Sequence, residues 1–251
     1  MKKSINWKVF FILLGSSLVS IVCVFPYIIT VQGELLSKSE VSLEFIFIAQ
    51  FLQSIVLFSV TAFIGLFLSQ KVGFRLPLLT ALTEKGDSKK ILKIILRPSV
   101  AWGTISALLI YIADFLFVIP GITTHQANAP VWQTLAASFY GGITEEMLMR
   151  LFLMTLFVWI GMKLFKQIKP SKIGVIIPIF LAAIIFGLGH LPITASLTLI
   201  TPLVIVRAIT LNGIGGIIFG WLYWKKGLES AIIAHFTTDI VLLTLFPLLI
   251  N

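Results

Sequence analysis

The stretch GGITEEMLMRLFLMTLFVWIG, residues 141–161, combines a long apolar run with two glutamates and an arginine near its beginning. A run of about 20 mostly apolar residues has the length of a helix that crosses a lipid bilayer. Glu145, Glu146 and Arg150 are costly in such a helix, since a charge at its centre costs roughly 2.5–3.5 kcal/mol. The stretch therefore predicts a membrane helix that carries a functional polar site.

The whole chain has the composition of a multi-pass membrane protein. Of its 251 residues, 58% are hydrophobic and 12% are charged, and the mean hydropathy is +1.06. Soluble domains contain about 45–50% apolar residues. Seven apolar segments have the length of a membrane span: 7–31, 43–68, 98–120, 132–162, 173–191, 199–224 and 228–250. We therefore predict an all-α bundle of about seven transmembrane helices.

The basic residues indicate the orientation of these spans, because short cytoplasmic loops retain Lys and Arg. Most of the 19 basic residues precede the first span or follow the second, fourth and sixth spans. The N-terminus is therefore predicted to lie inside, with a basic cytoplasmic loop at 69–97. The net charge of +9 is then mainly a topology signal, and we expect no nucleic-acid partner. Cys23 is the only cysteine, which excludes an intramolecular disulfide and a cysteine-rich metal site.

Several ionisable residues lie within the predicted spans, where such groups are functional candidates by default. They are Asp114, Glu145, Glu146, Arg150, His190, Arg207, His235 and Asp239. We assign Asp114 and Arg207 structural roles, as partners of one another or of the site. In the glycine-rich segment 213–220, Gly216 and Gly220 share a helix face, and we interpret them as a close helix contact.

Spacing divides the charged residues of the opening stretch. Glu146 and Arg150 are four residues apart and can pair across one helical turn, whereas Glu145 projects to a neighbouring face. Thr144 is a candidate cap for a helix start or kink after Gly142. One carboxylate is thus predicted to be held by the arginine, and Glu145 is left for chemistry.

Two later spans carry histidines in similar settings. FGLGH places Phe186 and His190 on one helix face, and HFTTD places His235 and Asp239 four residues apart. A poorly solvated carboxylate can act as a general base on water, and a histidine or an amide can stabilise the resulting oxyanion. The same residue types also suit zinc. Spacing alone leaves both routes open, as well as purely structural hydrogen bonds.

Three motifs in this order resemble those of the CPBP intramembrane proteases: Glu145-Glu146-x-x-x-Arg150, Phe186-x-x-x-His190 and His235-x-x-x-Asp239. That family includes CAAX prenyl endopeptidases and proteins of bacteriocin processing or immunity. The resemblance implies that Glu145 activates the attacking water together with His190. It also implies that His235 and Asp239 line the oxyanion side of the site.

The same resemblance implies supporting roles for the other motif residues. Glu146 and Arg150 would organise the site, and Phe186 would form its wall. Family members commonly have Asn at the position of Asp239. An ionised carboxylate would repel an oxyanion, so either Asp239 is protonated, or it orients His235 as the donor, or activity is reduced.

The predicted function is intramembrane hydrolysis of a peptide bond in a prenylated or otherwise membrane-bound peptide or protein. The N-terminal helices occupy 1–125 and the protease-like helices 126–251, in one membrane domain that we expect in the bacterial plasma membrane. No cofactor is required in this interpretation; zinc is the alternative, with Glu145, His190 and His235 as its ligands. The competing interpretations are a non-catalytic bacteriocin-immunity or regulatory protein and an ion-coupled transporter.

A straight-helix model places the site residues at different depths. Glu145 and His190 lie about 27 Å along their helices from Lys163 and Lys172, the loop residues on the predicted cytoplasmic side of these spans, at 1.5 Å per residue. His235 lies only about 14 Å from Lys226 at the same rise. A kink, a buried start of the last span or a different helix boundary is needed to bring these residues level.

Overall fold

The computed structural model describes residues 5–119 and 129–250, which form helices and their connections. Within these residues seven helical stretches are long and apolar enough to cross a membrane: Trp7–Ser37, Leu43–Val72, Ser88–Asp114, Val131–Leu164, Ile173–Ala195, Pro202–Lys226 and Leu228–Leu249. This part of the chain contains no strand. The predicted all-α membrane bundle is confirmed, and the inside location of the N-terminus stays a prediction.

Four spans are single helices, and three are composite. The single ones are α1 (Trp7–Ser37), α2 (Leu43–Val72), α4 (Ser88–Asp114) and α9 (Pro202–Lys226). The fourth span consists of α5 (Val131–Phe139), the π-helical segments η1 (Tyr140–Glu145) and η2 (Met147–Met154), and α6 (Thr155–Leu164). The fifth consists of α7 (Ile173–Gly189) and α8 (Leu191–Ala195), and the seventh of α10 (Leu228–Asp239), η3 (Ile240–Leu245) and α11 (Phe246–Ile250). One further short helix, α3 (Pro77–Thr83), connects α2 to α4.

Local sequence signals set several of the helix boundaries. The side chains of four N-cap residues accept backbone N–H hydrogen bonds in the first turn, as capping requires; they are Asn6, Ser42, Asp87 and Thr201. α2 ends at Gly73, whose φ of 82° is the left-handed conformation that favours glycine at a helix end. The segment 69–97 therefore includes the last turn of α2, all of α3 and the first turns of α4.

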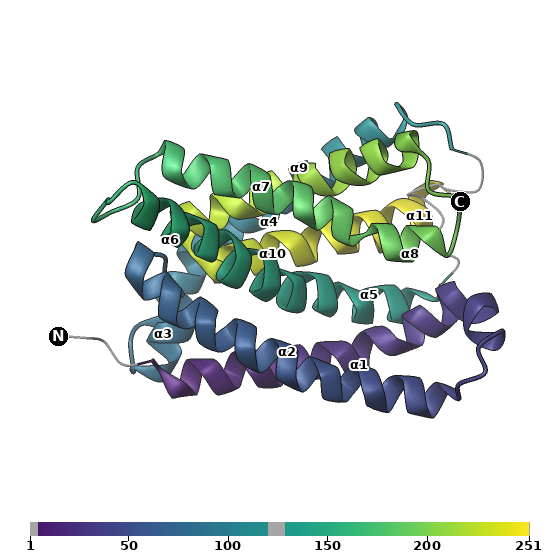
Figure 1. Ribbon diagram of the computed structural model, residues 1–251, viewed down its shortest axis with the longest axis horizontal. Helices are drawn as coiled ribbons and strands as arrows, with labels where there is room; N and C mark the ends of the chain where they lie inside the picture. Colours follow the sequence, from purple (N-terminus) through teal and green to yellow (C-terminus); the bar gives the residue numbers. More distant parts are fainter. Residues whose placement is uncertain (1–4, 120–128, 251) are drawn as a thin grey trace.

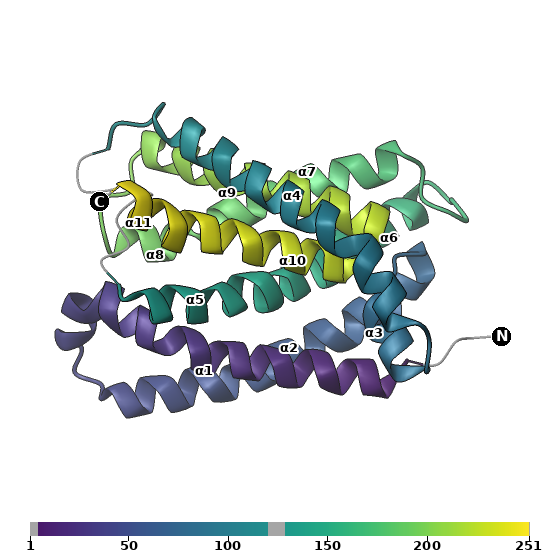
Figure 2. The ribbon, with the colours of Figure 1, turned by 180° about the vertical axis from the view of Figure 1, so that it is seen from behind.

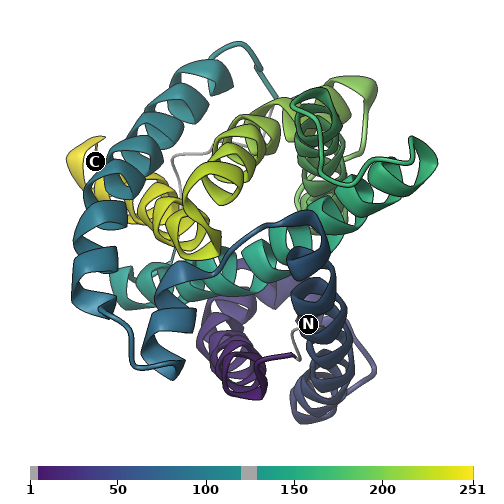
Figure 3. The same cartoon turned by 90° about the vertical axis from the view of Figure 1, so that its left-hand side faces the viewer.

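The fourth span lies at the centre of the bundle. Figure 3 looks along the helices and shows α5 and α6 between the α1–α2 pair and the group formed by α9 and α10. Figures 1 and 2 show the same arrangement from two sides, with α4 next to α9 and α10. α1 and α2 contact the fourth span from one side, and α7 and α10 contact it from the other. Its inner face is fully buried at Met147, Leu151, Met154 and Val158, and Glu146 and Arg150 near its centre are likewise enclosed by protein.

Glycine allows α7 and α9 to approach closely. A Cβ added at Gly216 would lie 2.7 Å from the Cβ of Ala183 on α7, which is too close for a larger residue. Gly220, one turn further along α9, faces Ile179 on the same neighbour. These contacts confirm the packing role predicted for segment 213–220.

Asp114 and Arg207, the two ionisable candidate residues that lie outside the three motifs, form an ion pair. Asp114, at the end of α4, lies 2.7 Å from Arg207, near the start of α9, measured from Oδ1 to Nε. Both side chains are largely buried. The pairing of Asp114 with Arg207, which was one of the two predicted alternatives, joins these helices at one end of the bundle.

The last span starts in a buried position beneath α3. Leu228 is fully buried, and its N–H donates a 3.1 Å hydrogen bond to the carbonyl of Arg75. The buried carboxylate of Glu229 accepts a 2.7 Å hydrogen bond from the N–H of Leu79. Because α10 begins below the covering segment 75–79, its residues lie deeper than their distance from Lys226 suggests. His235 does contact Glu146 and face Glu145, and the buried start of the last span is one of the three features that the sequence requires for this.

Candidate active site

The backbone that carries the two glutamates is π-helical on both sides of Glu146. The hydroxyl of Thr155 donates to the carbonyl of Arg150, five residues earlier, at 2.9 Å. π-helical turns are rare and frequently occur at functional sites. Thr144 lies inside this continuous helix, and its buried hydroxyl has no hydrogen-bond partner among the described residues. The prediction that Thr144 caps a helix start or kink is therefore wrong.

Glu146 links the fourth span to the seventh. Its Oε1 lies 2.8 Å from Nδ1 of His235, and its Oε2 lies 3.2 Å from Nε of Arg150. The side chains of Glu146 and Arg150 are at most 1% exposed. Because an ionised carboxylate only accepts hydrogen bonds, Nδ1 of His235 carries the proton. The Glu146–Arg150 pair predicted from spacing is confirmed, and it also fixes the orientation of His235.

Glu145 and Asp239 face the other nitrogen of His235. Nε2 lies 3.7 Å from Oε2 of Glu145 and 3.7 Å from Oδ1 of Asp239. These distances exceed those of direct hydrogen bonds, so a water molecule or a substrate oxygen is expected to bridge the groups. The side chain of Glu145 is 23% exposed, whereas that of Glu146 is not exposed at all. The fourth and seventh spans thus bring a restrained carboxylate, an accessible carboxylate and a histidine together, as the sequence predicts.

Two phenylalanines enclose the charged groups. The ring of Phe219 stacks on the imidazole of His235 at a centroid distance of 4.5 Å, and Phe186 meets the same imidazole edge-on at 5.7 Å. The guanidinium carbon of Arg150 lies 5.0 Å from the centroid of Phe186 and 5.5 Å from that of Phe219. These distances permit cation–π attraction. Phe186 thus occupies the wall position that the resemblance implies.

Phe219 is the site neighbour that sequence reasoning missed. It lies three residues after Gly216 and one before Gly220 in the segment interpreted only as a helix contact. Residues three apart share a helix face. The spacing from Gly216 therefore already places Phe219 near the face of the helix that packs against other helices. The segment therefore packs against α7 and also holds the imidazole of His235.

His190 lies at the C-terminal end of α7, beside Phe186. The two rings are 4.7 Å apart, and Nδ1 of His190 lies 2.8 Å from the carbonyl oxygen of Phe186. A carbonyl only accepts, so Nδ1 donates and the lone pair of Nε2 remains available. Within the described residues, the His190 imidazole forms no ion pair with Glu145. The joint action of His190 and Glu145 stays a prediction, and Phe186 is the group that contacts both histidines.

Gly141 leaves room for the side chains of the seventh span. A Cβ at this position would collide with the carboxylate of Asp239 and approach Nε2 of His235 to 3.2 Å. We expect Gly141→Ala to lower any activity of the site by about 100-fold, the size expected for a displacement of about 1 Å. Turnover by the purified protein, together with its thermal unfolding midpoint, measures this effect.

Gly161 offers a matched control for that substitution. It lies on α6 of the same span, and a Cβ there would meet no atom within 4 Å. Gly161→Ala should keep full activity and should not lower the unfolding midpoint, because Ala is the better helix former. Equal losses in the two variants would contradict the proximity of Gly141 to the site.

The part of the chain that the structure describes contains no group of three or more His, Cys, Asp or Glu side chains arranged to hold a metal ion. Of the three predicted zinc ligands, Glu145 and His235 face each other, but no contact joins His190 to either. A tetrahedral catalytic zinc site takes three protein ligands at about 2.0–2.2 Å for N and O donors. Glu145, His190 and His235 as they are arranged do not form such a site.

The fold and the site together define a multi-pass helical membrane protein with a buried carboxylate–histidine cluster. Residues 127–241, which include every predicted site residue, match the family model described as type II CAAX prenyl endopeptidase Rce1-like. This match confirms, over that segment, the resemblance to the CPBP intramembrane proteases. Comparisons with curated proteins and with solved structures gave no match.

Proposed function

We propose that the protein is an intramembrane endopeptidase that hydrolyses a peptide bond in a membrane-bound or prenylated peptide or protein. The observation that carries the proposal is the convergence of Glu145 and Asp239 on Nε2 of His235 inside an apolar bundle. Ionisable groups at such a position are costly and usually functional. The Rce1-like match over the segment that holds them supports a peptidase.

Glu145 acts as the general base in this proposal. Its carboxylate removes a proton from a water molecule as the water oxygen attacks the carbonyl carbon of the scissile peptide bond. The same proton passes to the leaving nitrogen when the C–N bond breaks, which gives a carboxylic acid and an amine. His190 orients the water through Nε2, the nitrogen not used by its hydrogen bond to Phe186.

His235 stabilises the oxyanion. Its hydrogen bond to Glu146 fixes the ring and leaves Nε2 directed toward Glu145 and Asp239. In the protonated imidazole, an Nε2–H donates to the developing negative charge, a contribution often worth about 100- to 1,000-fold in rate. Asp239 lies 3.7 Å from this nitrogen without a direct hydrogen bond, so Glu146 is the residue that orients the donor.

Peptide cleavage by the purified protein in lipid vesicles tests this proposal. The substrate is a synthetic peptide with a farnesylated cysteine, compared with the same peptide without the farnesyl group, and products are identified by mass spectrometry. We expect cleavage by the unmodified protein, and losses of about 100-fold or more in His190→Ala and in His235→Ala. Cleavage should be unchanged by a chelator such as EDTA.

The other outcomes separate the competing functions. A folded protein that cleaves neither peptide favours the immunity or regulatory function. Chelator sensitivity that zinc alone reverses favours a metal route over the glutamate route. Cleavage that persists in His235→Ala contradicts the assignment of the oxyanion donor.

The role of Asp239 has its own test. Asp239→Asn removes a negative charge next to the developing oxyanion and retains a side chain of the same shape. We expect activity to be equal or higher, because Glu146 already holds His235 at 2.8 Å and the 3.7 Å contact with Asp239 is not a direct hydrogen bond. The rate constant kcat of the variant measures this; a drop of 100-fold or more would show that His235 needs the ionised carboxylate.

A further inference from the structure

A cavity of about 460 Å³ opens between α2 and the start of η1. Its lining runs from Val41, just before α2, along one side of that helix to Phe58, and it includes Tyr140 of the fourth span. Pockets for small-molecule ligands commonly measure about 300–1,000 Å³. The cavity is therefore large enough to hold a short segment of a ligand. We name this cavity the α2 groove.

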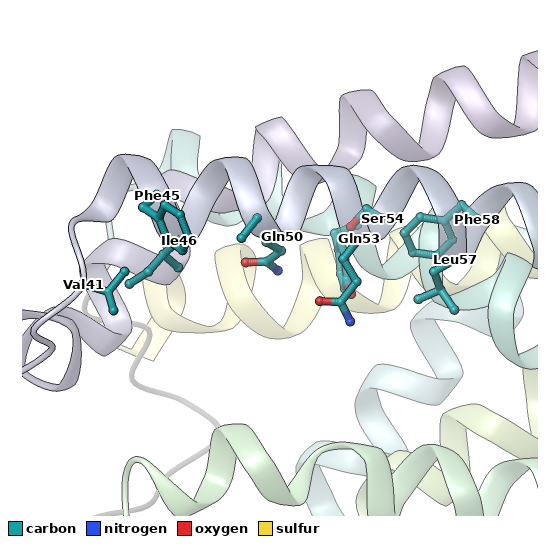
Figure 4. A pocket seen from close by; sticks show the side chains of 10 residues that line it. Val41, Phe45, Ile46, Gln50, Gln53, Ser54, Leu57 and Phe58 are labelled. Carbon is teal, nitrogen blue, oxygen red and sulfur yellow. The ribbon is translucent and has the colours of Figure 1, made fainter.

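The α2 groove contains amides that the protein itself does not use. Gln50 and Gln53 line it together with Ser54, and residues spaced in this way share one helix face. Figure 4 shows the two glutamine side chains projecting from the same side of α2. Neither amide forms a hydrogen bond with any described residue. Two unused amides in a membrane span are costly to expose to lipid, which indicates a polar ligand.

The groove leads toward the proposed catalytic base. Tyr140, which lines it, begins the π-helical segment that ends at Glu145. The two residues are therefore roughly one helical turn apart. Tyr140 and Glu145 are also close enough to interact electrostatically. A ligand seated along α2 would therefore extend to the neighbourhood of Glu145.

We propose that the α2 groove binds an extended segment of the peptide substrate beside the scissile bond. The role rests on the proposed peptidase function, because the groove leads to its base. An extended peptide in a membrane exposes backbone N–H and C=O groups that no water satisfies. The amides of Gln50 and Gln53 both donate and accept, so they can pair with these groups. The apolar lining, which includes Phe45 and Leu57, receives the side chains.

The mixed lining favours a peptide over a lipid chain. A prenyl or acyl chain has no hydrogen-bonding groups, so its binding would leave Gln50 and Gln53 desolvated and unpaired, which is unfavourable. An extended peptide satisfies these amides and also offers apolar side chains to Phe45 and Leu57. A lipid chain alone is therefore expected to bind the groove less well than a peptide.

Thiol protection tests occupancy of the groove without requiring catalysis. Cys23 is the only cysteine, so Cys23→Ser with Gln53→Cys leaves one thiol, inside the groove. Glu145→Gln is added so that bound peptide is not cleaved. The probe is the farnesylated peptide, and farnesylcysteine methyl ester is the lipid-only arm. Maleimide alkylation of the thiol in lipid vesicles is followed by mass spectrometry.

Gln70→Cys in the same background is the matched control, because Gln70 is an exposed glutamine of α2 outside the groove. At ten times its Kd a ligand leaves about one site in eleven free, so the peptide should slow alkylation of the Gln53→Cys thiol about tenfold. The Gln70→Cys thiol should be unaffected, and the lipid-only arm should protect neither. Absence of protection by saturating peptide, or equal protection by the lipid alone, overturns the proposal.

Kinetics give a second measurement in the catalytically intact protein. Gln50→Leu with Gln53→Leu should raise KM about tenfold and leave kcat within about twofold, because the lost hydrogen bonds act equally in the ground and transition states. Gln70→Leu should change neither constant. An unchanged KM in the groove variant contradicts the proposal. Thiol protection with no cleavage by the unmodified protein would instead leave the groove valid and contradict the peptidase function.

Discussion

Replacement of Glu145 by Gln is expected to abolish cleavage while the protein keeps its fold. The amide cannot remove a proton from water, and a positioned general base contributes about 10²- to 10⁴-fold to the rate. Glu145 is the most exposed carboxylate of the site and makes no direct hydrogen bond to His235, so its replacement disturbs little packing. Single-turnover cleavage of the farnesylated peptide in lipid vesicles measures the effect.

Two control measurements test whether the loss of cleavage is specific to the carboxylate of Glu145. Glu44→Gln changes an exposed glutamate in the first turn of α2 and should leave the rate unchanged. The unfolding midpoint of Glu145→Gln should match that of the unmodified protein within a few degrees. A folded Glu145→Gln variant that cleaves at an undiminished rate would show that Glu145 is not the base.

Replacement of Arg150 by Ala is expected to destabilise the protein strongly. Arg150 is buried, pairs with Glu146 and lies near the rings of Phe186 and Phe219. Breaking a buried ion pair by removing one partner typically costs about 3–5 kcal/mol, because the other charge stays buried without compensation. The free energy of unfolding, measured by denaturant titration in mixed micelles, should fall by that amount.

A double variant separates the charge effect from the loss of volume. Glu146→Gln with Arg150→Met removes both charges, and the glutamine oxygen can still accept the hydrogen bond from His235. A buried ion pair replaced by uncharged groups of similar volume often retains stability. The double variant should therefore recover most of the stability lost in Arg150→Ala. Arg150→Met alone keeps the volume and leaves the charge of Glu146 uncompensated, so it should be less stable than the double variant. If the two are equally stable, the uncompensated charge is not the cause of the loss.

The sequence predicts the architecture well because membrane spans depend on length and hydropathy. All seven predicted spans correspond to helices, although the third begins at Ser88, ten residues before its apolar core. The basic residues before that core remain helical because α4 extends beyond the apolar segment and Asp87 caps it. Composition defines the apolar core of a span, whereas its ends depend on local capping.

The site could be predicted only as far as spacing along one helix carries information. The i, i+4 pair of Glu146 and Arg150 follows from helix geometry alone. The hydrogen bond from His235 to Glu146 joins residues 89 positions apart, and it depends on the buried start of α10. The failed assignment of Thr144 as a cap has a related cause, because Gly141 serves the close approach of Asp239 and does not interrupt the helix.

Cleavage in H₂¹⁸O tests the central claim most directly. If Glu145 activates water for attack on the peptide carbonyl, the new carboxyl group of the product gains one ¹⁸O atom in a single turnover. Mass spectrometry of the two fragments should show this label with the unmodified protein and no product with Glu145→Gln. Labelled product formed at an equal rate by a folded Glu145→Gln variant, or no product from the unmodified protein, would contradict the claim.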